Sequence, residues 1–297
     1  MRRSDFIGAG DLRAMQQMCS RLWTPSSRFH PGQLAWNRYS RPVDGQGPGP
    51  DEAISLWREG SAVVGFGWAE AQDWLELQVD PSHAEVAEEI VEWFEDWSDA
   101  ETQSALVMEG DVSEPALVAA GFEPHPEAWH FVHHLLDLAD LAAAPRVPGY
   151  VLRQVDGASE AAPRAECHAR AWSEFGQSAV TADSYAAVMS AWPYRSDLDW
   201  VAIAPDGSMA ASCLVWLDPA TGVGLLEPVG CVPEHRGRGL AGAVTMAALH
   251  HLKDVGGRTA LVSPRGDDDY PGPRRLYQSL GFRPVARTLT WTRSFEA

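Results

Sequence analysis

Hydrophobic positions along the chain follow two spacings, and each spacing predicts one kind of element. Short apolar runs bounded by turn residues predict strands, and apolar residues three or four apart predict helices. In the first half the pattern predicts a helix at 11–22, strands at 53–58, 62–68 and 74–79, a helix at 83–97, a strand at 105–108, a helix at 115–120 and a strand at 129–136. Pro31-Gly32 predicts a break in the chain, and 42–50, rich in proline and glycine, predicts a loop.

The second half repeats this order of elements. The pattern predicts a strand at 150–155, helices at 161–172 and 185–192, strands at 200–203, 210–216 and 223–232, a helix at 242–253, a strand at 259–263, a helix near 277 and a strand at 282–291. Residues 138–148 predict a linker. We therefore expect an α+β chain of two domains, 1–140 and 149–297, each a mixed, mostly antiparallel sheet flanked by helices.

Composition narrows the class of protein. The chain has 297 residues, of which 45% are hydrophobic, and this is typical of soluble globular proteins with room for two domains. No stretch is apolar for long enough to cross a membrane, and no apolar core of a signal peptide follows Met1 to Asp5, so we expect a cytoplasmic protein. The four cysteines are scattered, which predicts free thiols and no metal site. One lysine among many arginines suggests a GC-rich bacterial source.

Charge is divided unequally between the halves. Residues 1–145 carry 25 acidic residues and 8 arginines, a net charge of −17, whereas residues 146–297 carry 16 acidic and 15 basic residues, a net charge of −1. A site for a polyanionic ligand therefore belongs in the second half, and nucleic acid is excluded as a partner of the first. The acidic first half either attracts a cationic substrate or serves only solubility.

One stretch carries the clearest chemistry. The apolar strand at 223–232 runs into Pro233-Glu234-His235-Arg236-Gly237-Arg238-Gly239-Leu240-Ala241, and a helix follows. Glycines at such a turn allow close backbone approach, and a helix start presents unpaired N–H groups and a positive dipole end. Physical chemistry alone thus predicts an anion site, suited to a pyrophosphate.

The spacing of this turn differs from the dinucleotide and nucleotide-hydrolase loops. It resembles the coenzyme A loop of the GNAT acetyltransferase superfamily. Arg274 to Phe282, which contains Leu276-Tyr277 and ends in Leu280-Gly281-Phe282, resembles the late helix of that superfamily, in the expected order. The two-domain layout is similar to that of the mycothiol synthases. The resemblance implies two tandem GNAT-like domains and acetyl-CoA as acyl donor, without a metal.

The resemblance also implies roles for particular residues. Acetyl-CoA would be held by the backbone of Cys231 and Val232 and by the loop residues Arg236, Gly237, Arg238, Gly239, Leu240 and Ala241. Tyr277 matches the tyrosine that protonates the departing thiolate; otherwise it is a packed aromatic residue. Glu227 is the candidate base, because burying an acidic residue in an apolar strand is costly unless the residue has a role or a partner. The alternative is that Glu227 forms a salt bridge.

The first domain lacks these features. Val79-Asp80-Pro81 aligns with Cys231-Val232-Pro233, but the first copy continues Ser82-His83-Ala84-Glu85, without glycine or arginine. Leu117 stands where the second copy has Tyr277. The first domain therefore resembles a degenerate repeat without a coenzyme A loop, with a structural role or a place in the wall of the acceptor pocket.

The resulting expectation is an N-acetyltransferase that moves an acetyl group from acetyl-CoA to a primary amine of a small molecule, in a ternary complex. Two alternatives stay open. In the first, the donor is a longer acyl-CoA or an acyl carrier protein, and the carrier would dock on Arg236, Arg238, Arg274 and Arg275. In the second, the chain is a non-catalytic coenzyme A-binding regulatory module. Neither the amine nor the oligomeric state can be predicted. Four aromatic residues are candidates to line the acceptor site: Trp172, Phe175, Trp192 and Tyr194.

Overall fold

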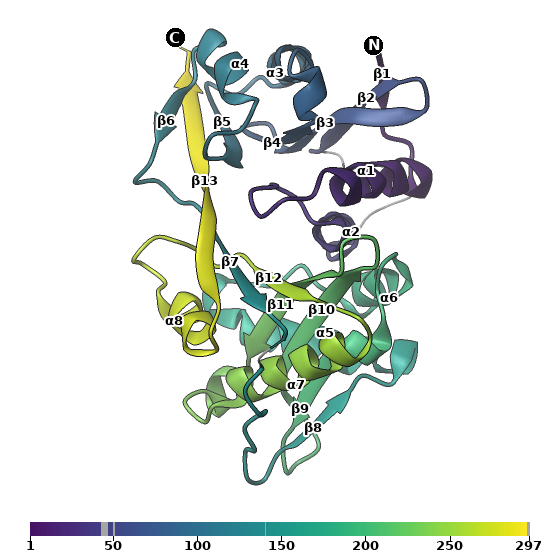
Figure 1. Ribbon diagram of the computed structural model, residues 1–297, viewed down its shortest axis with the longest axis vertical. Coiled ribbons are helices and arrows are strands. Elements are labelled where there is room, and N and C mark those ends of the chain that lie inside the picture. The colour runs from purple at the N-terminus through teal and green to yellow at the C-terminus, as the bar shows by residue number, and fades with distance from the viewer. Residues whose placement is uncertain (43–46, 50, 140, 296–297) are drawn as a thin grey trace.

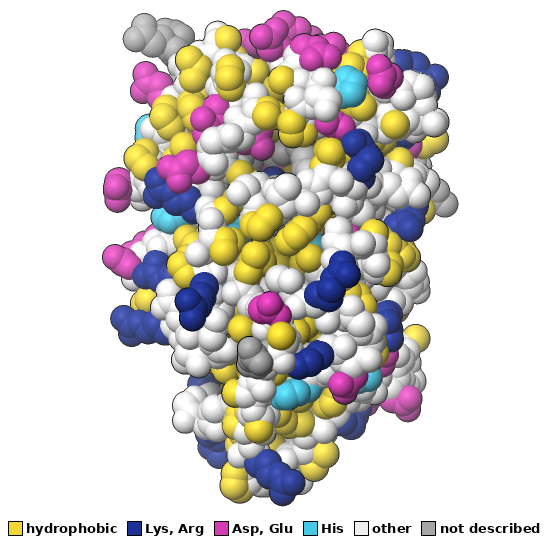
Figure 2. Space-filling view, in the orientation of Figure 1, with side chains coloured by type: hydrophobic (Ala, Val, Ile, Leu, Met, Phe, Trp, Pro, Cys, Tyr) yellow, Lys and Arg dark blue, Asp and Glu magenta, His cyan; other side chains and the backbone are white. Residues whose placement is uncertain are grey.

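The computed structural model describes residues 1–42, 47–49, 51–139 and 141–295. Part of the predicted loop at 42–50 and one residue of the predicted linker lie outside the described residues. The described chain forms two lobes, one from each half of the sequence, which are stacked along the long axis of the molecule (Figure 1). On the face shown in Figure 2, acidic side chains gather on the lobe of the first half, as the unequal charge of the halves predicts.

The first half contains seven strands and four α-helices among its described residues. They are β1 (Arg2–Asp5), α1 (Ala9–Leu22), α2 (Pro31–Tyr39), β2 (Ala53–Glu59), β3 (Ala62–Ala71), β4 (Trp74–Val79), α3 (Val86–Trp97), β5 (Thr102–Met108), α4 (Glu114–Ala119), β6 (Glu123–His125) and β7 (Val132–Asp137). The predicted helix at 83–97 is split, because a 3-10 turn at Pro81–His83 precedes α3. The strands β1 and β6 were not predicted from the sequence.

Helix α2 corrects the prediction of a break at Pro31-Gly32. Proline lies at the first helical position, where its missing N–H would have no partner in any case and its fixed φ angle suits a helix. The ring of His30 caps this helix, since its Nδ1 accepts a hydrogen bond from the N–H of Gly32 at 3.1 Å. The residues that predicted a break therefore start a helix instead.

The second half contains six strands and four α-helices among its described residues. They are β8 (Val151–Gln154), α5 (Ala161–Ala171), α6 (Ala182–Ser190), β9 (Asp199–Ile203), β10 (Met209–Asp218), β11 (Val223–Cys231), α7 (Leu240–Asp254), β12 (Thr259–Val262), α8 (Gly272–Ser279) and β13 (Arg283–Ser294). Thr181 caps α6 in a capping box with Ser184. The predicted α+β pattern is confirmed, with most strand pairs antiparallel.

The two halves exchange their last strands. The strand order is β1-β2-β3-β4-β5-β13-β7-β12-β11-β10-β9-β8, with β6 paired to β13. Strand β7 of the first half is therefore inserted between β12 and the start of β13, and the end of β13 pairs with β5 of the first half. Figure 1 shows β13 running along one edge of the molecule from the second lobe into the first. Neither half completes its sheet with its own residues alone.

Helices cover both faces of each sheet. In the first half α3 packs on one face and α1 on the other. In the second half α7 and Tyr277 of α8 pack on one face, and α6 lies on the opposite face with α2 of the first half. The side chains of Ala35, Trp36 and Tyr39 in α2 pack with Trp216 and Leu225 of the second half. The first half thus supplies both a strand and a helix to the fold of the second.

Candidate functional site

Strand β11 separates from β12 halfway along its length. The two strands pair in parallel only at three positions, the last being Leu225 with Leu261. From Leu226 to Cys231 the edge of β11 that faces β12 has no strand partner in the described chain. At this point β11 has a bulge, in which the two residues Glu227 and Pro228 lie opposite the single residue Leu214 of β10. The bulge opens a gap in the sheet.

The loop after β11 has the backbone of an anion site. Gly237 and Gly239 have φ angles of 75° and 79°, in the left-handed region that favours glycine. A Cβ atom at either glycine would meet no atom within 4 Å, so the space in front of the loop is open. The first backbone hydrogen bond of α7 runs from Ala243 to Gly239, so the N–H groups of Leu240 and Ala241 have no intrahelical acceptor. These donors are available to a phosphate group.

Arg236 is already engaged within the protein. Its backbone N–H donates to the carbonyl of Pro233, and its guanidinium donates to the carbonyls of Cys231 and Ala171 and to Glu174 at 2.8 Å. The expectation that its N–H faces a ligand therefore does not agree with this geometry. Arg236 holds the loop against the end of α5, whereas Arg238 is exposed and has no ion pair within the described residues.

A cavity of about 1070 Å³ connects this loop with the gap in the sheet. One end is lined by the loop and α7, and the middle by β11 and Tyr277. The other end is lined by both halves of the chain; the residues from the first half are Gln33, Trp36, Ser40, Arg41, Trp129 and Phe131. The cavity therefore joins the predicted coenzyme A loop to a region that the first half helps to enclose.

Glu227 lines this cavity at the bulge. Its backbone carbonyl accepts a hydrogen bond from the indole Nε1 of Trp216 at 2.6 Å, which fixes the strand, while its carboxylate has no ion pair or hydrogen bond within the described residues. Burial raises the pKa of this carboxyl to about 7; the charge of Arg28 opposes the rise, and the charges of Glu76 and Glu70 add to it. A carboxyl with a pKa near 7 exchanges a proton readily at neutral pH.

Tyr277 lies on α8 and faces the same cavity. Its ring is 6% exposed and packs against Phe282 at 5.7 Å between centroids. Within the described chain its hydroxyl makes no hydrogen bond, and burial raises the pKa of this phenol above its usual value. The hydroxyl is therefore protonated at neutral pH and can donate to a group in the cavity. Both predicted catalytic residues thus line one cavity with the loop.

The aromatic residues expected at the acceptor site divide into two pairs. Trp172 and Phe175 line the cavity, and the indole of Trp172 lies directly on Gly230, where a Cβ atom would be 2.2 Å from it. Trp192 instead contacts the guanidinium of Arg13 at 3.3 Å, and the hydroxyl of Tyr194 donates to Asp199. Tyr270, whose contacts could not be predicted, donates to Glu174 and packs against Phe175.

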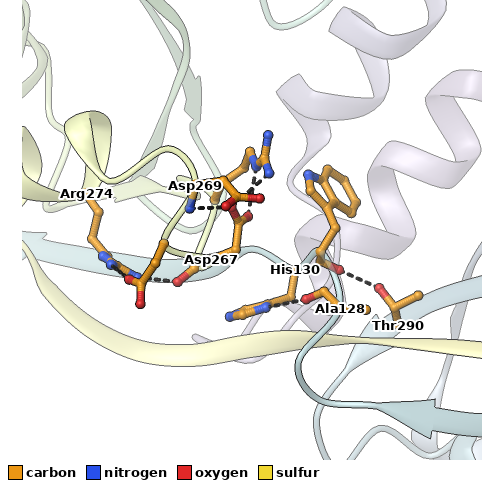
Figure 3. Close-up of polar contacts among 10 residues, drawn as sticks. Ala128, His130, Asp267, Asp269, Arg274 and Thr290 are labelled. Carbon is orange, nitrogen blue, oxygen red and sulfur yellow. Dashed lines mark hydrogen bonds and ion pairs between the residues drawn. The ribbon is translucent and has the colours of Figure 1, made fainter.

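The loop before α8 lies beside the segment of the first half that contains Ala128 and His130 (Figure 3). Arg265 forms two hydrogen bonds of 2.8 Å with Asp267, and Arg274 pairs with Asp268 at 2.8 Å. The N–H of Gly266 donates to the carbonyl of His130 at 2.9 Å. A bridge between the backbones of Phe131 and Arg265 places both residues at the wall of the cavity, which Trp129 and Tyr270 also line. The residues from the first half were not predicted as part of the site, because no local pattern sets them apart.

The corresponding turn of the first half is closed by its own side chain. Asp80 accepts a hydrogen bond from the N–H of Ser82 at 3.0 Å and pairs with Arg21 at 2.7 Å. A carboxylate thus stands at the start of this turn, where the second half has Val232, and it occupies an N–H group of the turn itself. Among all the helices of the described residues, none is long and apolar enough to cross a membrane.

The family to which part of the second half is similar can now be stated. Residues 165–282 match the model of a family described as the acetyltransferase (GNAT) family. The chain is similar to mycothiol acetyltransferase of Nocardiopsis dassonvillei, with 42% identity over 92 residues, or 28% of this chain and 27% of that protein. The matched stretch therefore spans about a quarter of that relative.

Solved structures show the same fold over the whole chain. A GCN5-related N-acetyltransferase from Sphaerobacter thermophilus has a TM-score of 0.60 at 19% identity, with 98% of this chain and 95% of that chain covered. A tandem GNAT protein from the clavulanic acid biosynthesis pathway has a TM-score of 0.61 at 19% identity, with coverage of 99% and 98%. An acetyltransferase from Colwellia psychrerythraea has a TM-score of 0.63 at 13% identity, with both chains fully covered.

Proposed function

We propose that this chain transfers an acetyl group from acetyl-CoA to a primary amine of a small molecule, and the match of residues 165–282 to the acetyltransferase (GNAT) family supports this. The observation that carries the proposal is the single cavity shared by the loop at 237–241, Glu227 and Tyr277. A direct transfer needs the donor, the acceptor, a base and an acid in one enclosed space.

The donor fits the loop and the gap in the sheet. The pyrophosphate of acetyl-CoA is held by Gly237, Gly239, Leu240 and Ala241, with Arg238 adding positive charge. The pantetheine arm starts at the loop, passes Val232 and Cys231 and continues along the unpaired edge of β11. It thereby directs the thioester towards Glu227. Arg236 supports the loop from behind rather than contacting phosphate.

The chemistry follows from the two side chains at the gap. Glu227, with a pKa of about 7, accepts a proton from the ammonium form of the acceptor, directly or through water. The neutral amine attacks the thioester carbonyl carbon, the C–N bond forms, and the C–S bond breaks as the tetrahedral intermediate collapses. The electron pair of the broken bond stays on sulfur, and the hydroxyl of Tyr277 gives its proton to the thiolate. The nitrogen loses its remaining extra proton, through water, to the oxygen of Tyr277, which restores the phenol. The products are an N-acetyl amide and coenzyme A.

We propose residues 149–297 as the catalytic domain and residues 1–140 as a degenerate domain that binds no coenzyme A. Two features favour free acetyl-CoA over a carrier protein as donor. Arg236 pairs with Glu174 and Arg274 with Asp268, so only part of the expected basic patch is free to meet an acidic carrier. A regulatory module without catalysis would have no use for Glu227 and Tyr277 at the same gap.

The test measures release of the coenzyme A thiol from acetyl-CoA with a panel of primary amines. We expect one class of amine to raise the rate above hydrolysis, and Tyr277→Phe to lower kcat by roughly 10²-fold with little change in the affinity for acetyl-CoA. Tyr150→Phe is the matched control, since Tyr150 bonds His235 outside the cavity. Equal kcat in Tyr277→Phe and wild type would reject the proposed role of Tyr277.

A further inference from the structure

His168 is a polar residue inside an aromatic stack at the end of the cavity that both halves line, which we call the acceptor end. Trp172 follows His168 by four residues, so the two side chains lie on the same side of α5. Their rings are stacked, with 4.3 Å between the centroids and 21° between the planes. The ring of Trp36 meets His168 at an angle of 60°, with 5.3 Å between the centroids. All three side chains line the cavity, and because Trp36 belongs to α2 the stack joins both halves.

Other aromatic side chains of the cavity are partly open to solvent. Trp129 is 37% exposed and Phe175 is 55% exposed. Trp129 packs against Phe131 with 4.6 Å between the ring centroids, and Phe175 packs against Tyr270 with 5.0 Å. Apolar surface that is exposed together inside one cavity is typical of a binding site for a small molecule. Aromatic rings attract one another beyond the effect of buried area, so this wall favours a ligand with a flat ring.

The imidazole of His168 lacks a hydrogen bond within the described residues. The side chain is only 7% exposed, and its Nδ1 atom is buried without a partner. Burial and the charge of Arg164 lower the pKa of this ring to about 3, so the ring is neutral, with one N–H donor and one nitrogen acceptor. Buried polar groups normally have partners, because leaving one unpaired costs stability. Since His168 lines the cavity, a bound molecule can supply the missing partner.

The charges around the cavity leave the acceptor end mainly aromatic. Arg236 and Arg265 each have a carboxylate partner, and Arg41 is exposed. The carboxyl of Glu227 has no ion pair among the described residues, and it suits the ammonium group of an amine. The rest of such an acceptor would therefore meet aromatic rings and the imidazole of His168.

We infer that the acceptor is a primary amine that carries a flat aromatic ring with a hydrogen-bonding substituent, such as a phenol hydroxyl, and that His168 recognises this substituent. The inference rests on the proposed function, which places the amine beside Glu227. It makes His168 a specificity-determining residue. It also makes Trp36 and Trp129, from the first half, part of the surface that selects the acceptor.

The first experiment measures binding without transfer, by calorimetric titration of amines into the protein saturated with coenzyme A. The probes are phenylethylamine, its meta- and para-hydroxyl derivatives, cyclohexylethylamine and glucosamine. We expect one hydroxyl derivative to bind about 10-fold more tightly than phenylethylamine, because it supplies the partner of His168. Cyclohexylethylamine has the same spacing between amine and ring, and it should bind about 3–10-fold more weakly than phenylethylamine because its ring is not flat.

The second experiment removes the ring nitrogens of His168. His168→Phe keeps a ring in the stack, so the advantage of the hydroxyl derivative should vanish while phenylethylamine and acetyl-CoA bind as in the wild type. A merely structural role of His168 would instead weaken all the amines equally. His250→Phe is the matched control and should keep the advantage, because His250 bonds the carbonyl of Ala142 outside the cavity.

A second variant tests the contribution of the first half. Trp129→Leu removes a partly exposed aromatic ring from the wall, and it should weaken the binding of phenylethylamine by about 3–10-fold without changing the binding of acetyl-CoA. This variant and the wild-type series keep the inference testable if His168→Phe does not fold.

The outcomes separate this inference from the proposed function. The inference is overturned if none of the amines binds, if cyclohexylethylamine or glucosamine binds as tightly as the phenolic amines, or if His168→Phe keeps the advantage of the hydroxyl group. Release of the coenzyme A thiol from acetyl-CoA is then measured with the same amines. If the phenolic amines bind in the expected order but release no thiol, recognition by His168 stands and the proposed transfer is rejected. If glucosamine is acetylated and the phenolic amines do not bind, the transfer stands and the inference is rejected.

Discussion

Replacing Glu227 by glutamine should make the protein both more stable and nearly inactive. Glutamine has almost the same shape as protonated glutamate but can neither ionise nor accept the proton of an ammonium group. In the folded protein burial raises the pKa of the Glu227 carboxyl from 4.5 to about 7. Ionising this carboxyl therefore costs folding free energy, and the variant removes that cost.

The size and sign of the stability change follow from that pKa. A rise from 4.5 to about 7 corresponds to at most about 3.4 kcal/mol at about 1.36 kcal/mol per unit. The carboxyl is partly open to the cavity, so we expect the lower value of about 1–2 kcal/mol. The cost is fully present above pH 7 and disappears as pH falls from 7 to 4.5, because the folded protein then takes up the proton first.

Two assays check this prediction. Urea unfolding at pH 8 should show Glu227→Gln to be more stable than the wild type, and the difference should vanish near pH 4. With an accepted amine, the wild-type kcat/KM should rise with pH and reach half its maximum near pH 7, while the variant should lose this step and about 10²–10⁴-fold in rate at pH 8. A variant that keeps the step near pH 7, or is less stable than wild type at pH 8, would refute the reasoning.

Two further predictions concern backbone and core. Gly239→Ala places a Cβ at a φ of 79°, so it should lower the free energy of unfolding by about 1–2 kcal/mol and weaken acetyl-CoA binding. Gly242→Ala, in the first turn of α7 with its nearest contacts at 3.7 Å, should be neutral or stabilising. Calorimetric melting compares the two variants, and equal melting temperatures would contradict the assignment of strain to Gly239. Asp199→Asn leaves the fully buried Arg164 uncompensated and should cost about 3–5 kcal/mol in urea unfolding; a loss below 1 kcal/mol would contradict it.

Local patterns predicted the elements that depend on local sequence. The apolar run at 223–232 and the glycines after it predicted a strand, a turn and a helix, and the structure has all three. Pro31-Gly32 predicted a break because both residues disfavour a helix interior. At a helix start the same residues are favourable, and the cap by His30 was not considered.

Long-range pairing could not be predicted in the same way. The repeat in the sequence suggested that each half completes its own sheet, because the final strands of both halves have similar patterns. Which copy of the last strand joins which sheet depends on contacts more than a hundred residues apart. The contribution of Trp36 and Phe131 to the cavity follows from this exchange and from the packing of α2, so it was also missed. Chemistry that belongs to one segment was predictable, and chemistry shared between the halves was not.

The most direct test of the account is calorimetric titration of the full chain with acetyl-CoA. The central claim is one competent coenzyme A site per chain, at the loop of the second half. We predict one molecule bound per chain, with binding lost in Arg238→Glu and kept in Arg146→Glu, which makes the same charge change at an exposed position between β7 and β8. Two sites per chain, or binding that survives Arg238→Glu unchanged, would contradict the claim.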